Sequence, residues 1–486
     1  MALKTYTFGS PKGLNTIQND LNMKDDYAPV FRNAIIDETG ADAKRPGFTK
    51  AGSAISGGPK IESVFEYRKK DGTSMKIAAA GGQLWKQNAD GTWTSIKTGL
   101  GSNKCSAAVF QDKIVFFNGV NLPFYYDGSS CTDLANLCTD WVYGDTPSIV
   151  FAYKGRLFAG GRPSDKTMVY YCALEDINDW VSANNAGYID LSTQLPQGRE
   201  LTDIKSWETY LAFMLNEETV IWNWTSPSSN SLEKIVPVGA PWGKSVSFAN
   251  DLIFVSRLGI KTLSRSLQSG ELNVGSLSEM VENLIQDLML NSPPVATAVY
   301  PYRRWVLFFF PPVLMAYDYT PQRKAWYKFD GIDAQSMLTI GNDLYFGASN
   351  GQLYKYERDF YSDDGVAISY YWETPWLYLG KLSTHKKPKF LNTVIGRNSL
   401  GALQVNLYQD FKAPVTLSKT ITANPESYWR TAHWRTAKWR STKNVDYNIP
   451  LMGRGKAVKF SFAHSENYKP FSIILNEMVS MEGGFR

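Results

Sequence analysis

Cysteine and histidine are scarce in this chain of 486 residues. Only four cysteines and three histidines occur, and four cysteines are too few for a disulfide framework in a chain of this length. The histidines lie far apart in the sequence, and the pair Cys131 and Cys138 has no second cysteine pair to complete a zinc site. We therefore expect no metal, no cofactor and a reducing compartment of synthesis.

Long apolar runs are also absent. The longest, residues 305–310, ends at Pro311-Pro312 and is far shorter than the roughly 20 residues of a membrane-spanning helix. The first residues, MALKTYTFGSPKG, contain no apolar core of the kind that signal peptides have. These absences predict a soluble protein without a membrane span or a secretion signal.

Aromatic residues, in contrast, are abundant: 25 Phe, 27 Tyr and 15 Trp. Large flat side chains are enriched in β-strands, so we expect an all-β protein. The apolar share of 43% and the charged share of 20% are ordinary for folded proteins, and the length indicates more than one domain.

One short pattern recurs along the chain. Apolar residues are followed by a turn with Gly or Asn and then by a second apolar or aromatic stretch, as expected for a β-hairpin. The units begin at Ile77, Ile114, Arg156, Leu211, Leu252, Trp305 and Leu344, between 37 and 55 residues apart. Such spacing is typical of β-propeller blades, and it predicts a propeller of about six blades (five to seven). An array of β-sandwiches is the alternative.

A helical pattern interrupts the β-units. Apolar residues from Leu277 to Met289 follow helical spacing, Ser276 or Ser278 offers an N-cap, and Pro293-Pro294 prevents continuation. We expect this inserted amphipathic helix to pack against the propeller, with a partner contact as the alternative.

The last hundred residues differ from the rest in pattern and charge. Alternation with period two predicts antiparallel strands with one solvated face, and residues 381–486 carry 17 Lys and Arg against 6 Asp and Glu. We predict an N-terminal segment (1–55) that packs on the C-terminal domain, a propeller (56–380) and a basic β-sandwich-like domain (381–486). The basic charge indicates a negatively charged partner or simply a solvated face.

Tryptophan and arginine alternate within 428–441, YWRTAHWRTAKWRS. Stacking on indole rings and phosphate contacts by guanidinium groups would suit nucleic acid. Packing between strands, with cation–π contacts, and a subunit interface are the alternatives. The candidate channel or interface residues are Trp429, Arg430, Trp434, Arg435, Trp439 and Arg440, with the basic run His385, Lys386, Lys387 and Lys389.

Motifs of common enzymes are missing. The chain has no G-x-S-x-G, no phosphate-binding G-x-x-x-x-G-K-[ST] and no H-E-x-x-H. Aspartates lie in turns such as Asp71-Gly72, Asp127-Gly128 and Asp330-Gly331, where the side chain is expected to accept bonds from its own backbone. We therefore predict a protein that is not an enzyme, with a carbohydrate-binding or carbohydrate-active propeller as the alternative.

Several short motifs resemble the tail nozzle proteins of short-tailed bacteriophages, also called phage stabilisation or tail accessory proteins. The motifs are Gly13-Leu14-Asn15, Asn33-Ala34-Ile35-Ile36-Asp37, Lys44-Arg45-Pro46-Gly47-Phe48, Leu258-Gly259-Ile260 and the ending Met481-Glu482-Gly483-Gly484-Phe485-Arg486. The opening around Arg45-Pro46-Gly47 is the most specific of them.

This resemblance implies a structural virion protein. Members of that family form a ring, usually of six copies, below the portal and adaptor, and the ring retains the packaged genome and conducts it during ejection. The implied partners are further copies of the chain, the portal or adaptor, tail fibres, spikes or needles, and genomic DNA that passes without sequence specificity. The implied location is the virion tail, with assembly in the host cytoplasm.

Overall fold

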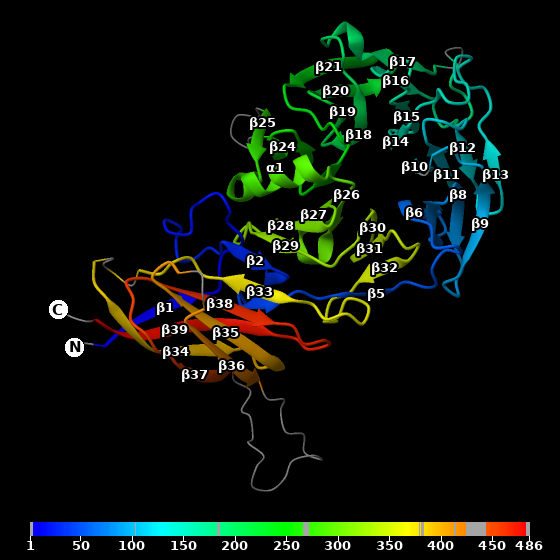
Figure 1. Cartoon of the computed structure of the whole chain (residues 1–486). Helices are drawn as coiled ribbons and strands as arrows, with labels where there is room; N and C mark the ends of the chain where they lie inside the picture. Colours follow the sequence, from blue (N-terminus) through cyan, green and yellow to red (C-terminus); the bar gives the residue numbers. More distant parts are fainter. Residues whose placement is uncertain are drawn as a thin grey trace.

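The computed structural model describes residues 3–102, 104–181, 185–265, 272–378, 380, 383–412, 415–423 and 444–482. Within these ranges the regular structure is almost entirely β-strand, and α1 (Glu282–Asn291) is the single α-helix. A ring of small sheets forms one end of the molecule, and a second domain of longer strands forms the other, with both ends of the chain beside it (Figure 1).

Among the described residues the ring consists of seven antiparallel blades of four strands each; six blades are separate sheets, and the blade β26–β29 is part of a nine-stranded sheet. Six of them are consecutive in the sequence: β6–β9 (Ile61–Arg68, Ser74–Ala80, Gln83–Gln87, Trp93–Thr98), β10–β13 (Ser106–Phe110, Lys113–Phe117, Phe124–Tyr126, Cys131–Asp133), β14–β17 (Ile149–Tyr153, Arg156–Gly160, Met168–Tyr171, Gly187–Asp190), β18–β21 (Leu201–Trp207, Tyr210–Leu215, Thr219–Ser226, Ser229–Val236), β22–β25 (Ser245–Phe248, Asp251–Ser256, Gly259–Arg265, Leu272–Ser276) and β26–β29 (Ala296–Tyr300, Trp305–Phe310, Val313–Asp318, Trp326–Phe329).

The seventh sheet closes the ring. It combines β30–β32 (Ser336–Ile340, Asp343–Gly347, Leu353–Tyr356) with β5 (Phe48–Lys50), which pairs antiparallel with β32 as the outermost strand. The innermost strand β30 contacts β6 of the first blade and β26 of the sixth. The chain is therefore a β-propeller whose last blade is completed by the N-terminal segment.

The propeller prediction is confirmed, and the blade number is seven rather than the expected value of about six, at the upper limit of the range of five to seven. Each of the seven recurring sequence units is the hairpin of the second and third strands of one blade. These hairpins are mostly buried on both faces, as in β27 and β28, where every residue is buried. Full burial explains why they appear in the sequence as continuous apolar runs.

The second domain consists of two sheets. One has the order β3-β4-β39-β34-β37, with β1 also paired to β39, and the other contains β2, β33, β38, β35 and β36. The strand bounds are β1 Leu3–Gly9, β2 Val30–Arg32, β3 Ala34–Ile36, β4 Asp42–Lys44, β33 Tyr370–Glu373, β34 Lys386–Ile395, β35 Gly401–Gln409, β36 Leu417–Ala423, β37 Val445–Pro450, β38 Val458–His464 and β39 Ser472–Glu482. Phe8 of the first sheet stacks on Phe460 of the second, with ring centroids 5.6 Å apart, so apolar faces of the two sheets meet in a sandwich.

The two domains share one continuous sheet. Strand β29 of the sixth blade pairs parallel with β2, and β2 pairs antiparallel with β33 of the sandwich. Strand β33 precedes residue 381, where the sequence pattern placed the domain boundary. The sandwich thus takes strands from the N-terminal segment and from the end of the propeller stretch as well as from the C-terminal residues.

Helix α1 packs against the propeller, as expected. Val281, just before the helix, and Ile285 within it are buried in the main apolar core, and α1 contacts β24. Ser278 occupies the N-cap position of the short 3-10 turn Glu279–Val281 that leads into α1, but its side chain makes no capping bond; its hydroxyl instead accepts a hydrogen bond from the backbone N–H of Ile260 (3.1 Å). The serine therefore ties the start of the helical segment to β24.

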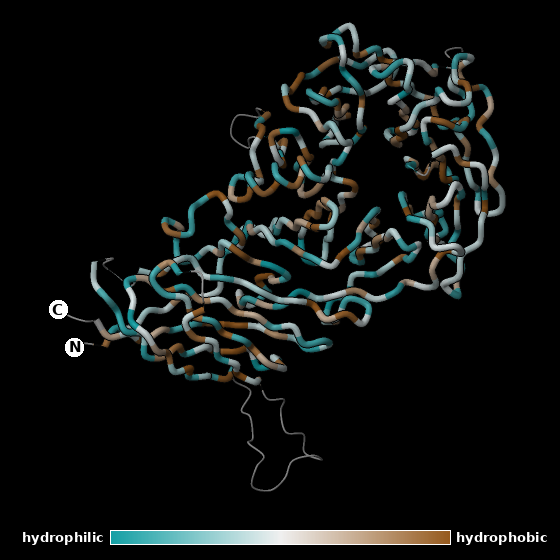
Figure 2. Tube along the Cα trace, viewed as in Figure 1, coloured by the Kyte–Doolittle hydropathy of each residue, from teal (hydrophilic) through white to brown (hydrophobic). Residues whose placement is uncertain are grey.

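Apolar residues are spread along the strands of both domains rather than gathered in one segment (Figure 2). Among the residues that the structure describes, no helix has the length and apolar character needed to cross a membrane.

Candidate functional site

A buried arginine lies where the propeller meets the sandwich. All five N–H donors of Arg45 have an acceptor: Nε donates to Asn33 Oδ1 (2.9 Å), Nη1 to Asp363 Oδ1 (2.9 Å) and the Pro46 carbonyl (3.0 Å), and Nη2 to Asp363 Oδ2 (2.6 Å) and the Asp330 carbonyl (2.8 Å). The Arg45 side chain is 0% exposed and that of Asp363 8% exposed. Burial of a charge is tolerated only with this degree of pairing.

The acceptors come from distant parts of the fold. Asp330 follows β29 of the sixth blade, Asp363 follows β32 of the seventh, and Asn33 lies between β2 and β3. Asn33 has a φ of 52°, a backbone region that asparagine tolerates better than most residues. We call Asn33, Arg45, Asp330 and Asp363 the interdomain joint, because they connect two blades to the start of the sandwich.

Glycine is required next to this joint. A Cβ atom on Gly47 would lie 1.9 Å from the backbone oxygen of Ser362, much closer than any real contact. This close approach lets the chain pass Ser362 at Gly47 and continue directly into β5, the outermost strand of the last blade. The run Arg45-Pro46-Gly47, the most specific part of the sequence resemblance, thus lies where the two domains meet.

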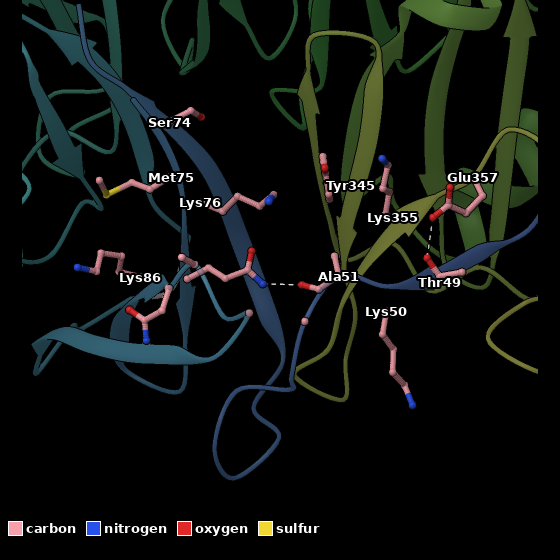
Figure 3. A pocket seen from close by; sticks show the side chains of 15 residues that line it. Thr49, Lys50, Ala51, Ser74, Met75, Lys76, Lys86, Tyr345, Lys355 and Glu357 are labelled. Carbon is pink, nitrogen blue, oxygen red and sulfur yellow. Dashed lines mark hydrogen bonds between the residues drawn. The ribbon is translucent and has the colours of Figure 1, made fainter. Parts of the chain in front are cut away.

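A polar cleft of about 680 Å³ lies between the first and last blades, beside the point of ring closure (Figure 3). We call it the closure cleft. Residues of β5, β7, β8, β31 and β32 line it, together with the turn that follows β8. A neighbouring cleft of about 600 Å³ shares Thr49, Lys355 and Glu357 with it.

Lysines and one tyrosine dominate the closure cleft. The Lys76 ammonium lies 4.6 Å from the centre of the Tyr345 ring, and the Lys355 ammonium lies 5.9 Å from the same ring. Figure 3 shows the ring between the ends of these two side chains. Burial and the nearby Lys355 lower the pKa of Lys76, whereas a hydrogen bond to Asp343 raises the pKa of Lys355.

The candidate residues from the sequence fall into two groups. Trp429, Arg430, Trp434, Arg435, Trp439 and Arg440 lie outside the described residues. Of the basic run, Lys386 is buried on β34 with Nζ donating to the Lys456 carbonyl (3.2 Å), so its ammonium does not face solvent. Lys387 is exposed, and His385 and Lys389 are partly exposed.

Sequence reasoning missed both the interdomain joint as a structure and the closure cleft. The lysines of the cleft are separated by as many as 305 positions, from Lys50 to Lys355, and only ring closure brings their strands together. No local motif marks them. The joint has one signal in the sequence, the Arg-Pro-Gly run, but this run does not by itself indicate a contact between domains.

The cysteines are poor nucleophiles. Burial raises the pKa of Cys105 to about 12 and the pKa values of Cys131, Cys138 and Cys172 to about 11, so all four thiols stay protonated near neutral pH. All four are free. Among the described residues, no group of three His, Cys, Asp or Glu side chains is placed to hold a metal ion.

Two of the three turn aspartates, Asp71 and Asp127, bond to their own loops, as expected, whereas the carboxylate of Asp330 pairs with Arg32 (3.5 Å). Asp71 accepts from the backbone N–H of Thr73 (2.8 Å), and Asp127 accepts from the N–H groups of Ser129 (2.7 Å) and Ser130 (2.8 Å). These bonds lower the pKa of Asp71 and bring the pKa of Asp127 to about 2. Carboxylates held in this way are structural.

Comparisons with known proteins add similarity of fold only. No family model matches the chain, and no curated protein matches it. Similar solved structures include a catalytically inactive virginiamycin B lyase from Staphylococcus aureus with quinupristin (14% identity, TM-score 0.44, covering 63% of this chain and 98% of that one). The WD40 β-propeller domain of Doa1 is similar at 10% identity and TM-score 0.43 (64% and 98% covered). The extracellular domain of a one component system from B. thetaiotaomicron matches at 9% identity and TM-score 0.47 (89% and 62% covered).

Proposed function

We propose that this chain is a structural virion protein, a subunit of the tail nozzle ring of a short-tailed bacteriophage. One observation carries the proposal. The residues with the most specific resemblance to that family, Arg45-Pro46-Gly47, supply the buried arginine of the interdomain joint and the glycine required next to it. A motif that serves to join the two domains fits a protein whose role is architectural.

The fold suits a subunit that must withstand mechanical force. The N-terminal segment contributes to both sheets of the sandwich and to the last blade, and one sheet runs from the sixth blade into the sandwich. A force applied to one domain is therefore transmitted to the other through strands and a buried ion pair rather than through a flexible linker. A ring of such subunits would hold its shape while DNA passes.

The proposed mechanism is mechanical and electrostatic and involves no catalysis. Basic side chains of the C-terminal region, among them Lys387 and the arginines of 428–441, would contact phosphates weakly and without sequence preference, so that the genome slides. Tryptophans of the same segment would bury area against neighbouring copies. The portal or adaptor above and the fibres, spikes or needle below are the proposed partners.

The chain's presence in virus particles tests this function. Purified virions should contain the chain in a fixed ratio to the portal, and imaging of the tail should place it in a ring, with six copies as the resemblance implies. Absence of the chain from purified particles would refute the proposal. Turnover of a polysaccharide by the isolated chain would refute it too.

A further inference from the structure

One face of the sandwich is apolar although no described element covers it. Strands β1, β39, β34 and β37 lie side by side in one sheet (Figure 1). Along β39, Leu475, Glu477, Val479 and Met481 alternate with buried residues and point away from the second sheet. We call these four residues, with the residues paired opposite them on β1, β34 and β37, the outer face. Every residue of the outer face is exposed or partly exposed.

The apolar side chains of the outer face are neighbours across the strands. Val479 lies opposite Phe390 of β34, and Phe390 lies opposite Pro450 of β37. We call this the central row; its Phe390 is 42% exposed. The adjacent row places Leu3, 65% exposed, opposite Met481. Side chains that are directly opposite lie about 4.5–5.5 Å apart at Cβ, so the apolar surface is contiguous, which is typical of a contact with another molecule.

The outward face of the second sheet provides a comparison within the same domain. It carries polar side chains, such as Gln404 and Asn406 of β35. Asn406 Nδ2 donates to the Ser461 hydroxyl (3.1 Å), and Lys459 pairs with Glu373 (2.5 Å). A face of this kind is expected where an antiparallel sheet meets water. The apolar character therefore belongs to the outer face and not to the domain in general.

Two charged side chains flank the central row. Lys387 of β34 lies one row to one side, opposite Met481, and Glu477 of β39 lies one row to the other side, opposite Asn392. Among the described residues, no ion pair involves Lys387 or Glu477. The third charged residue of the face is Asp446. Two acidic groups against one basic group do not suit a nucleic acid, whose binding rests on Lys and Arg.

We propose that the outer face binds the outer face of a second copy of this chain, as a two-fold symmetric dimer. A two-fold axis that passes through the central row, in the plane of the contact and perpendicular to the strands, lays one central row on the other. The same rotation brings the row of Lys387 onto the row of Glu477 of the second copy, on neighbouring strands. Because a two-fold contact repeats every pair, two ion pairs flank an apolar centre, as in interfaces with an apolar core and a polar rim.

This dimer differs from the contacts of a ring. Rings of identical subunits are built from head-to-tail contacts between unlike surfaces, whereas the outer face pairs with itself. The dimer therefore does not depend on the proposed function, and either can be absent without the other. A face of four strands offers fewer residues than the about 20–30 per side of a standard interface, so we expect the dimer to be reversible.

Sedimentation equilibrium of the full chain over a range of concentrations tests the dimer. The unchanged chain should show a monomer–dimer equilibrium. Phe390→Glu places like charges near the symmetry axis and should weaken dimerisation by about thirtyfold or more, as expected for a central contact. Gln404→Glu adds the same charge to the outward face of the second sheet and should dimerise as the unchanged chain does. Thermal unfolding of each variant verifies that it is folded.

Charge reversal tests the two-fold arrangement. Lys387→Glu and Glu477→Lys should each weaken dimerisation by about three- to tenfold, because each turns two attractive pairs into repulsive ones. A mixture of the two variants should recover the dimer, since a mixed pair has opposite charges at both contacts. An ion pair within one chain would not recover on mixing.

Four outcomes would overturn the proposal. They are a chain that stays monomeric at every concentration, an oligomer that Phe390→Glu leaves unchanged, an equal weakening by Gln404→Glu, and no recovery on mixing, which would indicate that the outer face binds a different surface. Binding of a short oligothymidylate that Phe390→Glu abolishes, without any dimer, would assign the face to nucleic acid instead.

Discussion

The guanidinium of Arg45 and the carboxylate of Asp363 meet as two parallel hydrogen bonds, Nη1 to Oδ1 at 2.9 Å and Nη2 to Oδ2 at 2.6 Å. The two residues are 318 positions apart in the sequence. Their pairing holds the segment before β5 against the segment after β32. Strand β5 pairs with β32 there as the outermost strand of the last blade. The propeller therefore depends on a contact that forms only when the chain's beginning returns to the end of the ring.

Removal of Asp363 should strongly destabilise the protein. Asp363→Ala leaves the charged Arg45 buried without its carboxylate, a change that costs about 3–5 kcal/mol in comparable buried pairs. Urea unfolding should show the loss as a lower transition midpoint, provided that unfolding is a single transition.

The neighbouring residue provides the matched control for this substitution. Asp364 pairs with Lys50, whose side chain is 57% exposed, and such a surface pair contributes about 0.2–1 kcal/mol. Asp364→Asn should therefore shift the midpoint little. Equal shifts in the two variants would contradict the central place of Arg45 and Asp363.

Gly47→Ala should loosen β5 from the last blade. The new methyl group would lie 1.9 Å from the Ser362 oxygen, a backbone atom that cannot rotate away, and overpacking of this kind costs about 1–3 kcal/mol or more. Hydrogen exchange should report faster exchange of the β5 amides.

Gly9 offers the control for this methyl group. A Cβ there meets no atom within 4 Å, so Gly9→Ala should change stability by less than about 0.5 kcal/mol and leave β5 protected. Unaltered exchange of β5 in Gly47→Ala would mean that Ser362 moves aside at no cost.

The sequence revealed the centre of every blade but not the closure of the ring. The middle strands are buried on both faces, so their apolar runs, such as those from Trp305 to Asp318, are visible without structural context. The closing strand β5 is only three residues long, Phe48–Lys50, too short for any periodicity to register. Its place is fixed by pairing with β32, a contact across most of the chain.

The same limit applies to the candidate site. The lysines near 386 are clustered in the sequence, which is why they were candidates for one basic surface. Period-two alternation along β34, however, turns Lys386 inward and Lys387 outward. The lysines that do face a common cleft, Lys76 and Lys355, are isolated in the sequence. Which charges converge was decided by the strand register and by ring closure, and neither can be read from composition.

His464 should make the sandwich sensitive to mild acid. Burial, with a smaller contribution from Lys44, lowers the pKa of His464 from 6.5 to about 4, and its Nε2 bonds to the Leu400 carbonyl (2.9 Å). Between pH 6.5 and about 4 the unfolded chain binds a proton that the folded chain does not, so stability falls as the pH falls.

Replacement of this histidine measures its share of the acid sensitivity. Urea midpoints at pH 7 and pH 5 should differ less in His464→Gln than in the unchanged chain, because glutamine keeps a donor for Leu400 but does not titrate. Between pH 7 and pH 5, the unchanged chain should lose about 1–2 kcal/mol more free energy of unfolding than His464→Gln does. The nearby Lys44, Glu466 and Lys469 remain in both proteins, so their titration cancels. An identical pH dependence in the two proteins would assign the acid sensitivity to other groups.

The arginines between β36 and β37 should matter for the assembled tail rather than for the fold. Arg430, Arg435 and Arg440 lie outside the described residues, and their joint replacement by alanine should leave the melting temperature of the isolated chain unchanged. If they contact DNA or a neighbouring copy, infected cells that supply only this variant should yield fewer particles, or particles whose genome is open to nuclease. A triple alanine variant of the exposed Arg68, Arg257 and Arg397 removes the same charge elsewhere and should leave particle yield unchanged. Full infectivity of the first variant would refute the proposed role of these arginines. Equal losses of particle yield in both variants would show that only the total charge of the chain matters.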